Sequence, residues 1–145
     1  MKILISSLLL AIIFIGCEKE QSNIDLSEQI KLTTDKPSYN KIDSIQLFLE
    51  NSSGSDIIVG LRCNEYLEMF YQEIENDNWS ADKYFWYMLL GCPTFPDTIQ
   101  ANSIFTYSMA AEVFDTVGTF RLLVPGYVLD IDSMMIVTSN SLEVN

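Results

Sequence analysis

The sequence predicts an all-β protein, an antiparallel β-sandwich of about seven to nine strands. Apolar and polar residues alternate with a period of two over most of the chain after residue 28. Clusters of turn-forming residues separate the alternating segments at intervals of about 8 to 15 residues, and no long segment has the 3.6-residue period of an amphipathic helix. The length of 145 residues suits one such domain, which we place at residues 28–145.

The first half of the predicted domain contains three strand-like segments. Residues 30–33 and 45–50 alternate between aliphatic and polar side chains, which predicts two strands with one buried face each. Residues 57–59 form an apolar run without alternation, which is typical of a strand covered on both faces. The turn clusters at 35–40 and 51–55 separate these segments.

The middle of the chain is aromatic and less regular. Residues 67–74 predict a strand, and the Asn and Asp residues at 76–78 predict the turn of a hairpin. Residues 84–90 are strongly apolar and fit either a strand or a short helix. Pro93 and Pro96 predict an irregular connection after this segment.

Three further strands are predicted toward the C-terminus. Residues 105–109 and 119–124 alternate with a period of two, and residues 134–144 contain the final strand. Turns are expected at 115–118 and at 125–126, where a proline precedes a glycine.

The N-terminus has the pattern of a bacterial lipoprotein signal. Lys2 gives it a positive start, and residues 3–15 are apolar except for two serines, a run too short for a membrane span. Residues 14–17, Phe-Ile-Gly-Cys, resemble a lipobox, in which the cysteine is acylated and becomes the first residue of the mature protein. The alternative is an ordinary signal peptide in which Cys17 is coincidental.

This resemblance implies a protein that is anchored to a membrane by lipid. Residues 1–16 would be the signal peptide, and residues 17–27 would be the acylated cysteine and a polar linker. Glu18-Lys19-Glu20 resembles the acidic tag that directs some lipoproteins of Gram-negative bacteria to the outer membrane. We therefore expect localisation in the bacterial cell envelope, at the outer membrane, either periplasmic or surface-exposed.

The composition excludes several classes of function. The chain has 8 Lys plus Arg, 20 Asp plus Glu and no His, which gives a formal net charge of −12 at pH 7. A protein this acidic repels a phosphate backbone, so no nucleic-acid partner is expected. Without imidazole there can be no His-based triad, general base or metal ligand. We expect no catalytic residues, no metal site and no cofactor.

Two cysteines remain if Cys17 carries lipid. Exported compartments are oxidising, so we expect Cys63 and Cys92 to form a disulfide that links the two sheets of the sandwich. Two free thiols or two metal ligands are the alternatives. The sequence has neither a Cys-x-x-Cys pair nor a His to complete a zinc site.

Several short motifs resemble small bacterial immunoglobulin-like domains. They are Asp35-Lys36-Pro37-Ser38-Tyr39, Asp43 before Ile45-Gln46-Leu47, Leu49-Glu50-Asn51-Ser52-Ser53, and Val117-Gly118-Thr119-Phe120-Arg121-Leu122. Lipid-anchored members without an assigned function and the intracellular proteinase inhibitor-like domains are the most similar. The resemblance implies an immunoglobulin-like β-sandwich. It does not imply inhibition of proteases, because no reactive-loop residues match.

Aromatic residues in the middle of the chain form the main candidate for a binding surface. Eight of the 17 aromatic residues lie at positions 66–87, and Tyr and Trp give large, rigid contact areas. The candidates for contact with a partner are Tyr66, Tyr71, Trp79, Tyr84 and Trp86. The alternative is a role in the core, in which one of the two tryptophans packs on the disulfide. Residues 84–87 are four consecutive aromatics, and a strand cannot bury all of them.

Four tripeptides have the form Asp, hydroxyl residue, apolar residue. They resemble the O-glycan acceptor sequence of some lipoprotein-rich Gram-negative bacteria, which would be modified here at Ser44, Thr98, Thr116 and Ser133. The alternative is that these residues mark the beginnings of strands, because Asp, Ser and Thr favour turns.

Together these features predict a noncatalytic binding or accessory module that uses an aromatic-rich surface. Its partners would be the membrane, through the lipid anchor, and an envelope protein or a glycan. One alternative is a small hydrolase or carbohydrate-active enzyme that uses carboxylates, which requires a concave site with convergent polar groups. The other is a purely structural envelope protein.

Overall fold

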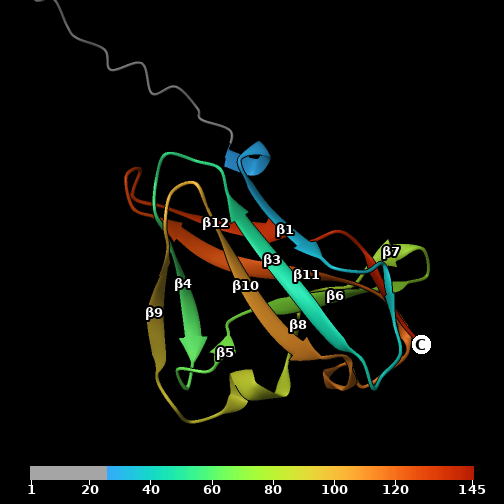
Figure 1. Ribbon diagram of the computed structural model, residues 1–145. Coiled ribbons are helices and arrows are strands. Elements are labelled where there is room, and N and C mark those ends of the chain that lie inside the picture. The colour runs from blue at the N-terminus through green and yellow to red at the C-terminus, as the bar shows by residue number, and fades with distance from the viewer. Residues whose placement is uncertain (1–25) are drawn as a thin grey trace, which may run out of the picture.

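The folded part of the chain consists of two predominantly antiparallel β-sheets packed face to face (Figure 1). The computed structural model describes residues 26–145. The first sheet has the order β1-β3-β10 and is formed by β1 (Ile30–Thr34), β3 (Ser44–Asn51) and β10 (Ser103–Ala110). The second sheet is built around β11 (Gly118–Val128). The prediction of an all-β sandwich is confirmed.

The second sheet has ten strands, five of them in the order β2-β13-β11-β4-β5. Besides β11 its strands are β2 (Ser38–Tyr39), β4 (Ile57–Arg62), β5 (Tyr66–Leu67), β6 (Phe70–Glu75), β7 (Asn78–Trp79), β8 (Lys83–Tyr84), β9 (Thr94–Ile99), β12 (Ser133–Thr138) and β13 (Leu142–Val144). The 3-10 helices are η1 (Leu26–Glu28), η2 (Trp86–Leu89) and η3 (Ala111–Val113). None of the helices within residues 26–145 is long and apolar enough to cross a membrane.

The order of the strands is immunoglobulin-like. β3 lies between β1 and β10 in one sheet, and β11 lies between β4 and the C-terminal strands in the other. β2 pairs in parallel with β13 and extends the second sheet. The described strands are more numerous than the predicted seven to nine because the second sheet contains several strands of only two or three residues.

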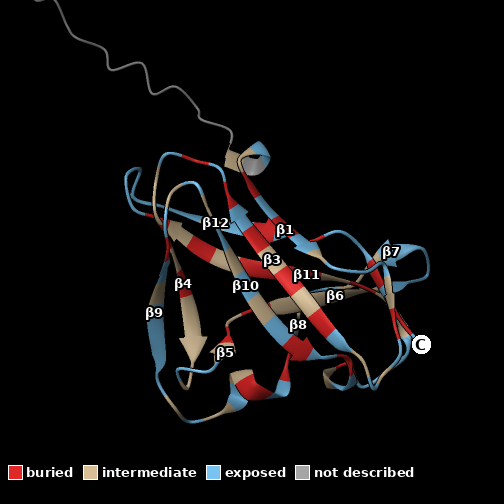
Figure 2. Cartoon of the chain, viewed as in Figure 1, coloured by how far each residue is buried: buried red, intermediate tan, exposed pale blue. Residues whose placement is uncertain are grey.

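A hydrophobic core fills the space between the sheets. Ile45, Leu47 and Leu49 of β3 are buried and alternate with more exposed neighbours (Figure 2). Phe120 and Leu122 of β11 are buried in the same core. Burial of one such side chain stabilises the fold by about 1.5 to 3 kcal/mol. The period of two in the sequence thus becomes one buried face on each sheet.

Two short strands, β4 and β6, share one side of β11. β4 pairs with residues 127–128 of β11 and β6 pairs with residues 120–123, so β4 and β6 occupy the same side of β11 at different heights. In the chain, β5 lies between β4 and β6, and it pairs with β4 instead of β11. The prediction of a single strand at 67–74 is therefore wrong, because residues 68–69 separate β5 from β6.

β11 continues through the Pro-Gly pair at 125–126, so the prediction of a turn there is wrong. On the side of β11 that faces β4 and β6, the pairing skips from 123 to 127. Pro125 falls in this gap, and a residue without a backbone N–H is tolerated where no ladder bond is needed. The turn instead occupies residues 129–132.

β9 replaces the irregular connection that Pro93 and Pro96 predicted. It pairs with β4 over its whole length and forms no other ladder with the described strands, so it is an edge strand. Proline is compatible with an edge strand because its missing donor can face away from the partner. The prediction was wrong because the sequence does not reveal which strands lie at an edge.

Three other segments differ in detail from their predictions. The apolar residues at 84–90 contain both a strand end and a helix, the end of β8 and then η2. In β4, Ile57 and Val59 are buried but Ile58 is only half-buried, so the strand is not covered fully on both faces. The final strand is split into β12 and β13 at Ser139, whose hydroxyl accepts a hydrogen bond from the N–H of Leu122 at 2.9 Å.

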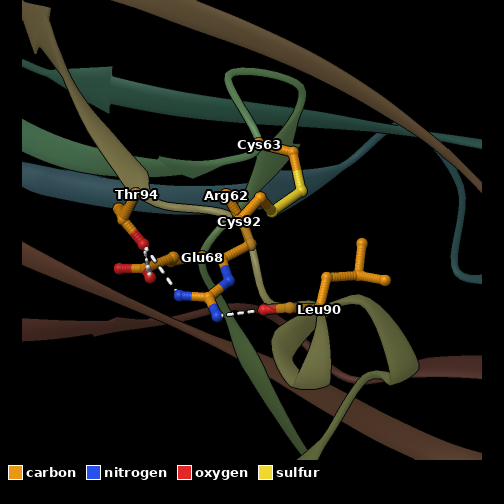
Figure 3. The surroundings of a disulfide bond; sticks show 6 residues. All are labelled: Arg62, Cys63, Glu68, Leu90, Cys92 and Thr94. Atoms are coloured by element: carbon orange, nitrogen blue, oxygen red, sulfur yellow. Dashed lines mark hydrogen bonds between the residues drawn. A yellow bond between two sulfur atoms is a disulfide. The ribbon is translucent and has the colours of Figure 1, made fainter.

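The predicted disulfide between Cys63 and Cys92 is confirmed, with Cα atoms 5.2 Å apart (Figure 3). The expectation that it links the two sheets is wrong. Cys63 follows β4 and Cys92 precedes β9, and these strands are neighbours in the same sheet. The N–H of Cys63 donates to the carbonyl of Pro93 at 3.0 Å, so this hydrogen bond continues the β4–β9 pairing by one step, and the disulfide links the two strands at the same end.

Candidate functional site

A cavity of about 520 Å³ lies where the end of β10, η2 and η3 meet. This end of the sandwich is opposite η1, where the described chain begins (Figure 1). We call it the aromatic cavity. It is lined by Glu65, Tyr66, Trp86, Tyr87, Tyr107, Ser108, Met109, Ala110, Glu112, Val113 and Asp115.

Three aromatic rings form a continuous wall of the aromatic cavity. Tyr66 stacks on Tyr87 with ring centroids 5.0 Å apart. Trp86 meets both rings edge-on, 5.5 Å from Tyr66 and 5.9 Å from Tyr87. Trp86 is 53% exposed and Tyr87 only 3%, so the wall runs from the surface into the interior. Tyr107 of β10 is the fourth aromatic residue of the lining.

The aromatic run at 84–87 divides between exposed and buried side chains. Tyr84 and Trp86 are exposed whereas Phe85 and Tyr87 are buried, so the prediction that not all four can be buried is confirmed. The backbone is extended at Phe85, before η2 begins, and successive side chains of an extended chain point to opposite sides. The Phe85 ring stacks on Tyr87 with centroids 5.5 Å apart, so the core supports the wall from behind.

The phenols of the aromatic cavity are neutral at ordinary pH. Burial raises the pKa of Tyr87, and the neighbouring Tyr107 raises it further. Burial also raises the pKa of Tyr107 and of Tyr66. Within residues 26–145 the buried hydroxyl of Tyr87 has no hydrogen-bond partner. Such a group costs free energy unless a ligand or solvent molecule satisfies it.

The charged residues that line the aromatic cavity are all acidic. Glu65, Glu112 and Asp115 contribute carboxylates, and no Lys or Arg occurs among the eleven lining residues. The nearby Lys41 ammonium donates instead to the backbone carbonyls of Phe114 at 3.1 Å and Asp115 at 2.7 Å. The cavity therefore combines apolar aromatic surface with a negative electrostatic potential.

The structure brings two of the five aromatic candidates together. Tyr66 and Trp86 both line the aromatic cavity. Tyr71 packs against the core, with its ring 4.8 Å from Phe85. Tyr84 is exposed and packs edge-on against Phe70 instead.

The remaining candidate, Trp79, lies on β7 beneath a cation. The guanidinium of Arg121 is 4.4 Å from the centre of its ring, and Trp79 is half-buried. Trp86 is exposed, so neither tryptophan is a fully buried core residue. The alternative in which one of the tryptophans is a buried core residue is therefore wrong.

Four residues that line the cavity, Glu65, Tyr87, Tyr107 and Glu112, were not among the binding candidates predicted from the sequence. Tyr87 occurs in a strongly apolar segment that fits a strand or a short helix, and Tyr107 occurs in an alternating segment that predicts a strand. Glu65 and Glu112 are two of 20 acidic residues. Their proximity depends on β5, η2 and the end of β10 meeting in space. The aromatic run was the one local signal that pointed to this region.

The other predicted sites lie on the surface or outside the described residues. Ser44, Thr98, Thr116 and Ser133 are all exposed. Ser44 and Ser133 each begin a strand, which also fits the structural alternative. Cys17, the residue predicted to carry lipid, lies outside residues 26–145. In the described part of the chain, no group of three or more Cys, Asp or Glu residues is placed to hold a metal ion.

No protein-family model matches the sequence, and no curated protein matches it. Among solved structures, the sporulation control protein Spo0M from Bacillus subtilis is similar to 81% of this chain at 10% sequence identity, with a TM-score of 0.43. A bacterial immunoglobulin-like domain from the M. primoryensis ice-binding adhesin is similar to 79% of this chain at 11% identity, with a TM-score of 0.36. These alignments cover 49% of the Spo0M chain and 94% of the adhesin domain.

A third solved structure is the Pseudomonas fluorescens alkylpurine DNA glycosylase AlkC bound to DNA that contains an abasic site analogue. It is similar to 77% of this chain at 10% identity, with a TM-score of 0.36, and the alignment covers 30% of its own length. This chain therefore spans about half of Spo0M and less than a third of the glycosylase. The assignment of the fold rests on the strand order described above.

Proposed function

We propose that this protein is a noncatalytic binding module of the bacterial cell envelope, a small immunoglobulin-like lipoprotein anchored through Cys17. The aromatic cavity is the observation that supports a binding role. Its volume of about 520 Å³ lies within the range of about 300 to 1,000 Å³ that is typical of ligand sites. Its wall of Tyr66, Trp86 and Tyr87 offers rigid aromatic surface at small entropic cost.

The proposed localisation is the outer membrane, on its periplasmic or its outer side. The support is the lipobox-like sequence that ends at Cys17 and the acidic residues that follow it. The position of η1 at the end opposite the aromatic cavity is compatible with a tether, because the cavity would then face away from the membrane (Figure 1). The exposed Ser44, Thr98, Thr116 and Ser133 are proposed sites of O-glycosylation.

The binding proposal is tested with solubilised envelope components. Glycans and peptides from the native envelope are screened by saturation-transfer NMR against the full chain and against Trp86→Ala. The proposal expects at least one component to bind and Trp86→Ala to weaken that binding by about tenfold or more.

Tyr84→Ala is the matched control, since Tyr84 is 62% exposed but does not line the cavity. Equal binding by Trp86→Ala and the unchanged protein would contradict the proposal. A component that is chemically converted rather than retained would favour the enzymatic alternative.

The anchor is tested by Cys17→Ser. With residues 1–16 replaced by a signal peptide that is cleaved without acylation, this variant is expected to move from the membrane fraction to the soluble fraction, because the cysteine carries the acyl chains that hold the protein. Mass spectrometry of the unchanged protein is expected to show the acyl chains on Cys17, and an unacylated Cys17 would contradict the proposal. The same spectra report glycans on the four hydroxyl residues.

A further inference from the structure

We propose that the aromatic cavity binds a small organic cation of the quaternary ammonium class. This inference rests on the proposed binding function and names the chemistry of its ligand. It arises from two properties that occur together in the cavity. The lining contains aromatic rings, and its charged residues are acidic, with no Lys or Arg among them.

Trp86 is the ring of the aromatic wall that offers an accessible surface for cation–π contact. A cation is attracted to an aromatic face when it lies within about 6 Å of the ring centroid, and Trp gives the strongest contact. Trp86 lines the cavity and is 53% exposed, whereas Tyr66 and Tyr87 stack on each other, so each of these two rings has one face covered. A cation in the cavity can therefore contact Trp86, with the stacked tyrosines as apolar surface beside it.

The electrostatic potential of the lining favours a positive ligand over a neutral one. Glu65, Glu112 and Asp115 are acceptors without a donor to offer, and the nearby Lys41 ammonium, which binds the backbone carbonyls of Phe114 and Asp115, offsets only one of their three charges. The hydroxyl of Ser108 already contacts Ser44 and the side chain of Gln46, each at 2.8 Å. A sugar is bound by a cavity that supplies both hydrogen-bond donors and acceptors, whereas a cation requires only a negative potential.

The apolar wall selects among cations by their hydration. A primary ammonium is strongly hydrated and would lose its hydrogen bonds to water against the rings. A quaternary ammonium carries its charge inside a shell of methyl groups, so both its charge and its apolar surface suit the wall. The buried hydroxyl of Tyr87 is available for a polar group elsewhere on the ligand.

The test compares two probes of the same shape. Choline chloride and its neutral carbon analogue, 3,3-dimethylbutan-1-ol, are titrated into the full chain in a nonionic detergent, with binding followed by calorimetry and tryptophan fluorescence. Choline is expected to bind at least about tenfold more tightly than the neutral analogue. Its affinity is expected to fall as NaCl is raised, because salt screens the carboxylates.

Two variants locate the effect. Trp86→Leu keeps an apolar side chain at a 53% exposed position but removes the aromatic face, and it is expected to weaken choline binding by about tenfold. Glu112→Gln is expected to weaken it severalfold. Asp130→Asn, at an exposed acid in the 129–132 turn outside the cavity, is the matched control and is expected to change nothing. Circular dichroism confirms that each variant is folded.

The outcomes separate this inference from the proposed function. Equal affinity for choline and the neutral analogue would overturn the inference while leaving an aromatic binding site. Absence of choline binding, or choline binding that Trp86→Leu leaves intact, would also overturn it. The proposed function fails independently, when envelope components bind equally to Trp86→Ala and to the unchanged protein.

Discussion

The side chain of Asn51 links two loops by hydrogen bonds inside the protein. Its side chain is fully buried, and its amide N–H groups donate to the carbonyls of Ser55 at 2.8 Å and Gln100 at 3.0 Å. Its amide oxygen accepts from the hydroxyl of Ser53 at 2.6 Å. A single amide thus satisfies groups in the loop after β3 and in the loop between β9 and β10.

Replacement of Asn51 by Asp is expected to lower the free energy of unfolding by about 2 to 4 kcal/mol. The new carboxylate would place an oxygen against two carbonyl oxygens in a buried site. Asn78→Asp, at an exposed position that begins β7 and whose amide donates to one carbonyl, is the control and is expected to cost less than about 1 kcal/mol. Urea unfolding measures both, and equal losses would contradict the role given to Asn51.

Asp35 gives part of the stability a defined pH dependence. Burial raises the pKa of its carboxyl group, but hydrogen bonds from the Tyr39 hydroxyl at 2.7 Å and the Gln46 N–H at 2.9 Å outweigh it, so the pKa is lowered from 3.8. A lowered pKa in the folded state means that this contribution is present above about pH 4 and is lost as the pH falls through the folded-state pKa.

Asp35→Asn is therefore expected to lower the free energy of unfolding by about 1 kcal/mol at pH 7, since a charged acceptor is lost at a largely exposed site. The difference from the unchanged protein is expected to shrink below about pH 4. Urea unfolding at pH 7 and at pH 3 measures this difference. A constant difference at both pH values would contradict the assignment.

The segment that carries η2 is held to the sheet by covalent and polar links. The disulfide joins Cys92 to the end of β4, and the guanidinium of Arg62 donates to the carbonyl of Leu90 (Figure 3). Arg62 also donates to the hydroxyl of Thr94 at 3.3 Å. These links fix the chain a few residues after Trp86, so the aromatic wall depends on them.

Replacement of both Cys63 and Cys92 by Ala is expected to lower the free energy of unfolding by about 3 to 4 kcal/mol, from the entropy of the 29-residue loop that the bond closes. Amide hydrogen exchange is expected to rise most in residues 86–92, with β1 and β3 as internal reference. Uniform acceleration across both sheets would show that the disulfide does not act locally on η2.

The sequence allowed prediction of elements that depend on local pattern. Strands β1, β3 and β10 alternate regularly because each buries one face, and the turn before β7 depends on residues that tolerate a positive φ, Asn76 at 50° and Asp77 at 62°. The strand through Pro125 could not be predicted, because it depends on a gap left by β4 and β6. The aromatic cavity could be predicted only at Tyr66 and Trp86.

The charge of the whole molecule opposes its compact state. The chain carries 20 acidic and 8 basic residues, and the ion pairs found within residues 26–145 are those of Lys83 with Glu73 and Glu75. Repulsion among the acidic groups is therefore stronger than the attraction within these ion pairs, and salt weakens both.

Raising NaCl from 20 to 200 mM is expected to increase the melting temperature by a few degrees. The Debye length falls from about 20 Å to about 7 Å over this range, which screens repulsion between carboxylates far apart on the surface. Differential scanning calorimetry measures the change. Sucrose at equal osmolality is the control for effects unrelated to charge, and a fall in melting temperature with NaCl would contradict the interpretation.

The separation of η1 from the aromatic cavity has a consequence for how ligands arrive. β10 runs between these two ends and has eight residues, so it spans about 25 Å. Under the proposed tether, the mouth of the cavity stands beyond the reach of headgroups in its own bilayer. The protein would then bind solutes from the surrounding fluid or contact a surface that faces the membrane. Many copies side by side would place their binding sites at the same distance from the bilayer.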